Sequence, residues 1–435
     1  MTTPSNPSPL PDSSLFGRRH IINAGSLLAL GLFMSDRPIY AEEFVGNKPK
    51  TNDTNVTPVT IAVIGLGEQG RALLTALSHT PGADVRMVCD HYENAHRRAL
   101  EIAPKATAVL EAKQVFDDKS IQAVWIATPP HLHKDLVIAA LQAGKHVYCE
   151  APLAHTIDDA RAIAKAAQGA TGQIFHSGLQ QRTNPQHLHV EKFIRTGALG
   201  NLTQGKGHWH RRTSWKKAAA SDERQKALNW RLQKNITPGL MGEIGIHQLD
   251  IASWFLKKLP VSVSGFGGVL GWEDGRQVHD TVHCVLSFPD NRRFMYDATL
   301  TNSFDANSET FQGTDAAVLL RDHRAWMFKE ADAAALGWEV YAYRDKIGDD
   351  TGIALVADAT KILAAGKQPG ENRDVDPTRT ALVSSAEAFL NAIRTKGTSA
   401  CDALTGFQAT VIALKAHEAT ATGSTIIFDP AWFKI

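Results

Sequence analysis

Long runs of one kind of residue are scarce in this chain. Lys and Arg number 46 against 45 Asp and Glu, a net charge of +1, and no long basic run occurs, so nucleic acid is not an expected partner. The longest apolar run, residues 21–34, is interrupted by Asn23 and Ser26. It is shorter than the roughly 20 residues that a transmembrane helix needs, so no membrane span is expected.

Cysteine is also rare, and no Cys-x-x-Cys spacing occurs. The four cysteines are Cys89, Cys149, Cys284 and Cys401. Most lie in or beside an apolar run, which favours buried thiols over disulfides. The group His279, Asp280 and His283 resembles a metal cluster only superficially, because no further ligand is indicated. No metal site is expected.

The length and composition are those of an ordinary globular protein. The chain has 435 residues, of which 43% are apolar and 21% charged, which excludes a disordered or fibrous chain. At about 100–200 residues per domain, this length predicts two folded domains with accessory segments.

Residues 1–41 have the pattern of an export signal. The pair Arg18 and Arg19 precedes the mildly apolar stretch, and Ala41 ends the segment before acidic residues. The arginine pair favours twin-arginine export, which carries folded proteins, and hence a periplasmic or secreted location. Residues 42–57 are predicted to be a flexible leader. A disordered tail with a chance apolar run is the alternative interpretation.

A glycine-rich turn follows the first apolar run of the folded part, residues 59–64. The turn consists of Gly65, Leu66, Gly67, Glu68, Gln69 and Gly70. In this GxGxxG spacing, the first glycine permits a tight turn, the second lets the backbone approach a pyrophosphate, and the third lets the following helix pack on the strand. The helix N-terminus offers free N–H groups to the phosphates. The turn is therefore predicted to bind a dinucleotide.

An acidic residue in the right place strengthens this prediction. Residues 85–89 are a predicted strand that ends in Asp90, twenty residues after Gly70. A carboxylate there accepts hydrogen bonds from the adenosine ribose and repels a 2′-phosphate, which favours NAD over NADP. An exposed helix cap is the alternative role for Asp90.

Strands and helices then alternate through residue 177, which predicts a parallel, doubly wound sheet. Thr128, Pro129 and Pro130 follow one predicted strand end, and Glu150 follows the next. Ligands of such sheets bind beyond the carboxyl ends of the strands, so both segments are expected to line the cofactor crevice. This Rossmann domain is predicted to span residues 58–180.

Four motifs together resemble a known family. They are Gly65-x-Gly67-x-x-Gly70, Ala127-Thr128-Pro129-Pro130-x-x-His133, Gly144-Lys145-His146-Val147 and Glu150-Ala151-Pro152-Leu153. The chain resembles the Gfo/Idh/MocA family of sugar and cyclitol oxidoreductases from about residue 59 to its C-terminus. The resemblance implies a second α/β domain with a large open, mostly antiparallel sheet, here residues 181–435, and a homo-oligomer. It also adds His133 to the cofactor-binding residues.

One departure from the family pattern concerns the last of these motifs. The usual Glu-Lys-Pro has a lysine that reaches toward nicotinamide and substrate, and this chain has Ala151 instead. A methyl group can neither donate a hydrogen bond nor stabilise a developing alkoxide. Relatives without the lysine include proteins that use NAD to assist glycoside cleavage, so plain dehydrogenase chemistry is open to question.

The predicted catalytic pair lies in residues 239–250. Residues i and i+4 share a face of an α-helix, so Glu243 is expected to orient His247, with Asp250 one turn further on. A histidine can take a hydroxyl proton as hydride leaves the carbon. The family carries its base and acidic partner in a similar acid-x-x-x-His pattern. A helix start with a packed histidine is the alternative.

Weaker candidates are expected to contact a sugar. Arg182, Asn184, His210 and Asp250 are the predicted substrate-binding residues, and His208, Trp209, Trp215 and Asn302 are further possibilities. Aromatic rings can form a platform for a pyranose face, but solvated strand faces or core packing explain these residues equally well.

Three functions are compatible with these residues. The first is an exported NAD-dependent oxidoreductase of sugars, glycosides or polyols, whose cofactor is tightly held and recycled in place because free nicotinamide cofactor is not expected outside the cytoplasm. The second is an NAD-assisted, redox-neutral glycoside hydrolase. The third is a nonenzymatic sugar-binding protein that kept the fold.

Overall fold

The computed structural model describes residues 56–321, 324–339, 342–357 and 380–435. The predicted export signal and nearly all of the predicted leader lie outside these residues. No helix in the described ranges is long and apolar enough to cross a membrane.

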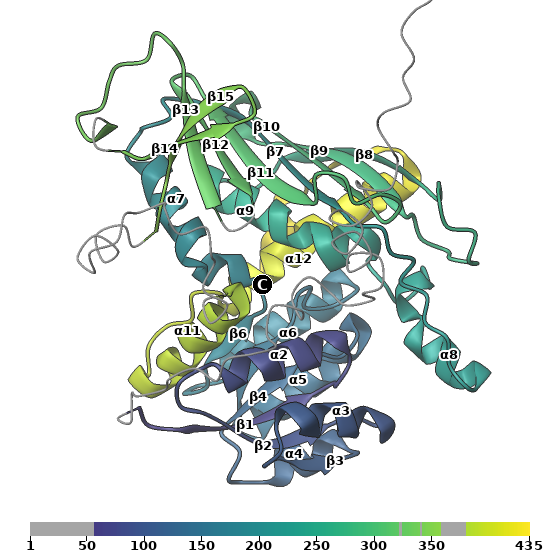
Figure 1. Ribbon diagram of the computed structural model, residues 1–435. Coiled ribbons are helices and arrows are strands. Elements are labelled where there is room, and N and C mark those ends of the chain that lie inside the picture. The colour runs from purple at the N-terminus through teal and green to yellow at the C-terminus, as the bar shows by residue number, and fades with distance from the viewer. Residues whose placement is uncertain (1–55, 322–323, 340–341, 358–379) are drawn as a thin grey trace, which may run out of the picture. The chain divides into compact units, whose positions relative to one another are not determined.

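The first sheet is parallel and doubly wound, as the sequence predicted (Figure 1). Its strand order is β3-β2-β1-β4-β5-β6. The strands are β1 (Val59–Ile64), β2 (Ala83–Cys89), β3 (Thr107–Val109), β4 (Ala123–Ile126), β5 (His146–Cys149) and β6 (Phe175–Ser177). The order reverses between β1 and β4, and in open α/β sheets the ligand crevice lies at such a reversal.

Five helices connect these strands. They are α2 (Glu68–Ser78), α3 (Asn94–Ile102), α4 (Ala112–Asp117), α5 (His133–Gln142) and α6 (Ile157–Gly169). Strands β1, β4 and β5 are buried on both faces because helices cover both, and their sequences are correspondingly almost wholly apolar. The sequence did not predict β3, whose three residues are too few to show a pattern.

The second sheet has ten strands in the order β14-β15-β13-β12-β11-β7-β10-β9-β8-β16. Only β7 and β10 pair in parallel, so the sheet is mixed and mostly antiparallel, as expected. The strands are β7 (Leu202–His210), β8 (Ser262–Gly268), β9 (Thr281–Ser287), β10 (Arg293–Thr299), β11 (Asn307–Gly313), β12 (Ala316–Arg321), β13 (Arg324–Lys329), β14 (Arg344–Ile347), β15 (Asp350–Ala354) and β16 (Thr425–Ile427). The predicted hairpin is β9 and β10.

Three helices of the second half pack against one face of this sheet: α7 (Pro185–Arg195), α9 (Ile246–Leu256) and α12 (Ala403–Thr422). The second half also contains α8 (Asp222–Leu228) and α11 (Ala381–Thr395). Helix α9 packs so closely on β7 that a Cβ added at Gly207 would lie 3.3 Å from Gln248. The opposite face of the sheet is open: Lys206, Val285 and Met295 lie side by side on it and are exposed.

The two C-terminal helices tie the sheets together. In α11, Phe389 packs edge-on against Trp125 of the first sheet, with the ring centroids 5.0 Å apart. In α12, Thr410 Oγ1 accepts a hydrogen bond of 3.0 Å from the backbone N–H of Leu153. The sequence did not indicate that α11 completes the core of the first sheet. All four cysteines are buried and free, as predicted.

Candidate functional site

The glycine turn has the geometry that its spacing predicted. Gly65 has a positive φ of 90°, and a Cβ there would lie 2.8 Å from the backbone of Ala127. A Cβ at Gly70 would lie 1.8 Å from the carbonyl oxygen of Gly65. Both positions therefore require glycine, because any side chain would collide with backbone atoms.

Gly67 differs from the other two glycines. A Cβ at Gly67 would meet nothing within 4 Å, and Gly67 caps the N-terminus of α2 without a side-chain hydrogen bond. The first N–H groups of α2 consequently face space that no side chain fills. This arrangement fits the pyrophosphate of a dinucleotide, which binds to such helix ends.

The carboxylate of Asp90 is held in place by backbone donors. Its Oδ2 accepts a hydrogen bond from the N–H of Leu66 and its Oδ1 one from the N–H of Tyr92, both of 2.9 Å. Each carboxylate oxygen has a second lone pair. Asp90 is therefore fixed beside the glycine turn and can still accept ribose hydroxyls, as its predicted role requires.

Glu150 and Gln69 form a contact between the two halves of the crevice. Gln69 Nε2 donates to Glu150 Oε1 over 3.0 Å, and Glu150 is 7% exposed. Burial raises the pKa of Glu150 to about 7. Near neutral pH this carboxyl is therefore present in both its charged and its neutral form. The neighbouring Ala151 has no positive charge that would stabilise the charged form.

His133 differs from its predicted role. Its ring is buried, Nε2 lies 2.8 Å from the carbonyl oxygen of Thr128, and Nδ1 lies 3.1 Å from that of Pro152. Both ring nitrogens face backbone carbonyl oxygens, and a neutral imidazole donates to only one of them, so His133 bridges the two crevice loops through contacts within the fold. Thr128 is different, because its buried Oγ1 has no partner among the described residues. Pro129 and Pro130 lead from Thr128 into the short 3-10 helix Pro130–Leu132.

The predicted catalytic histidine, His247, lies just after an unusual helical turn. Residues Met241–Gly245 form a π-helix, from which α9 continues. Such turns are rare and frequent at functional sites. The Nδ1 of His247 is buried without a hydrogen-bond partner in the described part of the chain, and burial lowers the pKa of His247 to about 4. The imidazole is therefore neutral at physiological pH and able to accept a proton.

Glu243 does not orient His247 as expected. Its Oε2 instead accepts a hydrogen bond of 2.9 Å from Arg231 Nε, and no hydrogen bond joins it to His247 in the described ranges. The spacing i, i+4 brings side chains together on an α-helix, whereas the wider π turn rotates them apart. Burial raises the pKa of Glu243, and Arg231 opposes this shift. The other oxygen, Oε1, is buried without a partner in that same part of the chain.

Three of the predicted substrate-binding residues form hydrogen bonds with other residues of the protein. Arg182 makes two hydrogen bonds of 2.8 Å to the carboxylate of Asp250, which is 4% exposed. Asn184 caps α7 by accepting a hydrogen bond from the N–H of Gln186. The bidentate pair joins the 3-10 helix Gln180–Thr183 to α9, so Arg182 and Asp250 satisfy one another.

His210 lies on the wrong face of the sheet for its predicted role. Along β7, Lys206, His208 and His210 share the open face, while Gly207 faces α9. The His210 Nε2 lies 2.5 Å from Asp297 Oδ2 on the neighbouring strand. The alternation was visible in the sequence, but only the packing of α9 decides which face is covered.

Sequence reasoning missed Arg231, the ion-pair partner of Glu243. Its guanidinium lies 4.4 Å from the ring centroid of Trp230 and 5.7 Å from that of Trp215. These two rings and the Glu243 carboxylate position the charge. Nothing in the sequence around Arg231 distinguishes it from a surface arginine, because its partner is twelve residues away.

Two histidines of the crevice loops were also missed. The rings of His131 and His155 are perpendicular, with centroids 6.1 Å apart, and the Nδ1 of each is buried without a partner among the residues described. His131 follows Pro130 directly and His155 follows the Glu150 motif. Their places in the sequence therefore already indicated that both lie in the crevice loops.

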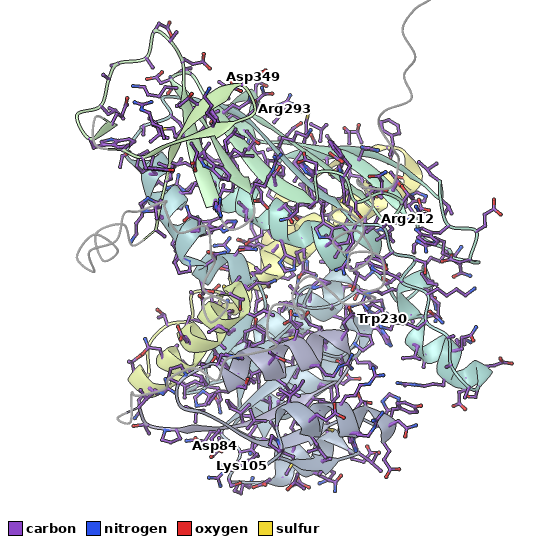
Figure 2. All side chains as sticks on the ribbon, in the orientation of Figure 1. Asp84, Lys105, Arg212, Trp230, Arg293 and Asp349 are labelled. Atoms are coloured by element: carbon purple, nitrogen blue, oxygen red, sulfur yellow. The ribbon has the colours of Figure 1, made fainter. Side chains whose placement is uncertain are left out.

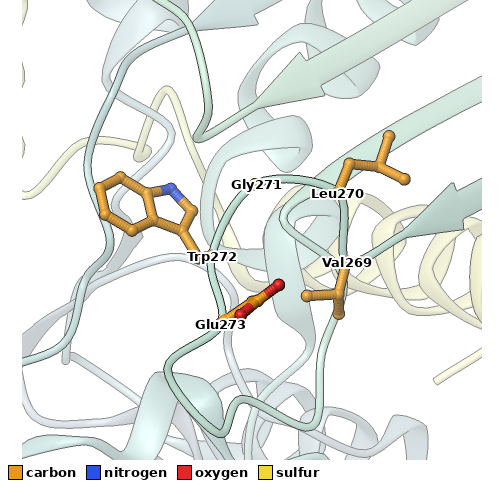
Figure 3. A pocket seen from close by; sticks show the side chains of 5 residues that line it. All are labelled: Val269, Leu270, Gly271, Trp272 and Glu273. Carbon is orange, nitrogen blue, oxygen red and sulfur yellow. The ribbon is translucent and has the colours of Figure 1, made fainter.

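A small cavity of about 300 Å³ lies apart from these residues. Figure 3 shows its lining: Val269, Leu270, Gly271, Trp272 and Glu273. Asp280 holds this loop by accepting hydrogen bonds from the N–H groups of Leu270, Gly271 and Trp272. Asp280 therefore has a structural role in this loop. Within residues 56–321, 324–339, 342–357 and 380–435, no group of three or more His, Cys, Asp or Glu residues is arranged to hold a metal ion.

Comparison with known proteins identifies relatives of both halves of the chain. Levoglucosan dehydrogenase of Pseudarthrobacter phenanthrenivorans is 29% identical over 236 residues, which cover 49% of this chain and 58% of that protein. A glycosyl hydrolase family 109 protein of Shewanella pealeana is 24% identical over 216 residues, 46% of this chain and 47% of that protein. The chain thus spans about half the length of these curated relatives.

A solved structure agrees with the fold. Levoglucosan dehydrogenase in complex with NADH and levoglucosan superposes with a TM-score of 0.69 at 21% identity, covering 85% of this chain and 99% of that one. Two family models match in sequence order: the oxidoreductase family with an NAD-binding Rossmann fold over residues 59–178, and the GFO/IDH/MocA C-terminal domain over residues 187–319. Together they match more than half of the chain, which therefore belongs to the Gfo/Idh/MocA family of oxidoreductases.

Proposed function

We propose that the chain is an NAD-dependent oxidoreductase that acts on a sugar, glycoside or polyol. The observation that carries this proposal is the neutral, partly buried His247, whose Nδ1 has no partner in the described ranges. Its family has an NAD-binding Rossmann fold, and the glycine turn and Asp90 fit that cofactor. Relatives that act on levoglucosan and inositol support a carbohydrate substrate.

The roles of the residues follow from their charges and partners. Bound NAD supplies a reversible hydride acceptor. His247 accepts the proton of the substrate hydroxyl whose carbon is oxidised and returns it in the reverse direction. The unpartnered Glu243 Oε1 accepts a hydrogen bond from a neighbouring hydroxyl. Burial raises the pKa of that carboxyl, and Arg231 opposes the shift. The cofactor is tightly held and recycled in place.

A second candidate is an NAD-assisted glycoside hydrolase with no net redox change. Two observations favour it: Ala151 occupies the place of the family lysine, and one relative is named a glycosyl hydrolase family 109 protein. In this reaction, transient oxidation of the sugar acidifies the proton at the adjacent carbon. The aglycone then leaves by elimination, and water addition and reduction restore the sugar.

A panel of defined glycosides and free sugars tests both candidates. A keto-sugar with stoichiometric NADH supports the oxidoreductase, and a released aglycone without NADH accumulation supports the hydrolase. Neither product, with sugar binding intact, supports a nonenzymatic protein instead. We expect His247→Ala to lower either activity by about 10²–10⁴-fold. His210→Ala, on the open face of the sheet, is the matched control and is expected to remain active. A fully active His247→Ala variant would rule out the proposed base.

We also propose that the protein is exported by the twin-arginine route. The support is the pair Arg18 and Arg19 before the apolar stretch of residues 21–34. Replacing both arginines by lysine is expected to keep the protein inside the cell in a fractionation experiment. An unchanged distribution would contradict this location.

A further inference from the structure

A long connection of the second half runs beside the dinucleotide site. Residues 211–231, called the arm below, follow β7 and contain α8. Figure 2 labels Arg212 and Trp230 near the two ends of the arm. The arm contacts the first half of the chain twice, and near its end it contacts the helix of the predicted base.

The first contact of the arm reaches the glycine turn. Lys217 Nζ lies 3.8 Å from Glu68 Oε2. Glu68 directly follows Gly67, whose surroundings are open. Lys217 is thus a cation close to the place where the pyrophosphate is expected.

The second contact lies at the adenosine end. The Arg224 guanidinium carbon is 3.7 Å from the ring centroid of Tyr92, a close face-on stack. Tyr92 follows Asp90 by two residues and donates its backbone N–H to that carboxylate. The Nε of Arg224 is buried and has no partner in the described parts of the chain. A stacked guanidinium with an unused N–H is suited to an acceptor atom of a nucleoside.

The third contact is the ion pair of Arg231 with Glu243, which lies in the π-helix directly before α9. Taken in order, Lys217, Arg224 and Arg231 lie at the glycine turn, at the ribose-binding end, and beside Glu243, four residues before the predicted base. These are the places expected for the pyrophosphate, the adenosine and the reacting centre of one dinucleotide.

Polar contacts hold the arm in this course. Asn229 Oδ1 accepts a hydrogen bond of 2.7 Å from the N–H of Lys217, and Asn229 Nδ2 donates over 2.8 Å to the carbonyl oxygen of Lys217. Lys216 Nζ donates over 2.8 Å to the carbonyl oxygen of Asp274. Because these contacts hold the arm on both sides of α8, the position of Arg224 against Tyr92 is already set in the folded chain.

We propose that the arm retains the cofactor and that Arg224 is a cofactor-binding residue from the second half of the chain, recognising the adenosine part of NAD(H). The tenfold change in release rate expected below corresponds to about 1.4 kcal/mol. The inference rests on the proposed use of NAD, and it is independent of which sugar reacts.

The rate of NADH release tests this role without any substrate. The full chain is loaded with NADH, an excess of NAD⁺ is added, and the loss of bound-NADH fluorescence is followed. We expect Arg224→Ala to release NADH about tenfold faster than the unmodified chain. Lys226→Ala, an exposed residue of the same helix, is the control and is expected to release NADH at the original rate. Equal rates for the two variants would overturn the proposal.

A second variant approaches the same contact from the other side. Tyr92→Leu is expected to accelerate release as well. Because Arg224 and Tyr92 act through one stack, the double variant is expected to be at most about twofold faster than Arg224→Ala alone. Fully multiplicative effects would overturn a shared contact. This experiment contains no sugar. Faster NADH release in Arg224→Ala would therefore support cofactor retention by the arm even if the proposed oxidation of carbohydrates failed.

Discussion

At the scale of single residues, the acidic residue four positions before the proposed base is paired with an arginine. Ala151 cannot carry the positive charge that a lysine would bring to the crevice. Arg231 brings a guanidinium to Glu243 instead, held between that carboxylate and Trp230. The Glu243 side chain is 7% exposed; burial raises its pKa, and the charge of Arg231 opposes that rise.

Removing this cation is expected to alter the pH dependence of activity. In Arg231→Met, burial would raise the pKa of Glu243 further, so the carboxyl would stay protonated to a higher pH and the acid limb of the kcat/KM profile would move upward. The measurement is kcat/KM as a function of pH, with a substrate that the panel of glycosides and sugars identifies. Arg212→Met, which changes an exposed arginine of the same arm, is the control. An unshifted profile in Arg231→Met would show that Glu243 does not titrate in the reaction.

Individual side-chain partners were the least predictable feature of the site. The sequence placed Glu243 and His247 on the expected segment, but their partners are set by Arg231, twelve residues earlier, and by a π turn. Apolar periodicity does not distinguish a π turn from an α turn over five residues. For the same reason, the pairing of Arg182 with Asp250 could not be read from residues 68 positions apart.

At the scale of elements, the glycine turn and α2 behave as one unit. Gly70 lets the turn close, because any Cβ there would strike the carbonyl of Gly65. Gly67 leaves the end of α2 open to a ligand and has a φ of −62°, which any residue adopts. Two neighbouring glycines of one motif thus serve folding and binding separately.

A matched pair of substitutions separates these roles. Gly67→Ala is expected to change the free energy of unfolding by no more than about 1 kcal/mol, because the new methyl group meets open space. It is expected to weaken NAD binding strongly. Gly70→Ala is expected to destabilise the protein itself, because backbone must move. Chemical denaturation without cofactor and NADH titration measure the two effects. Gly67→Ala with unchanged NADH affinity would contradict binding across this turn.

At the scale of the whole molecule, the ten-stranded sheet has one covered and one open face. On the open face, Val285 and Met295 are paired across β9 and β10 and are 36% and 42% exposed. Phe266 on β8 is 67% exposed and lies opposite His283 in the same sheet. Contiguous exposed apolar side chains on a sheet mark an association surface.

We therefore propose that copies of this chain associate through the open face. Met295→Lys is expected to shift the protein toward smaller species in sedimentation velocity, because a buried lysine would lack a partner. Leu270→Lys is the control, since Leu270 is 74% exposed but lies outside the sheet. A monomeric unmodified chain, or an unshifted Met295→Lys variant, would contradict this proposal.

The sequence by itself determined the local chemistry of the dinucleotide site. Gly65, Gly67 and Gly70 act through the conformation and close approach of their own backbone, and Asp90 follows directly from the end of its strand, so short-range order was enough. The tertiary structure decided which predicted polar residues meet. It turned His210 toward the open face, placed the His133 ring between backbone carbonyls, and brought Arg224 to Tyr92 and Arg231 to Glu243. These outcomes depend on which surface a helix covers and on contacts between distant segments, and spacing along the chain carries no information about either.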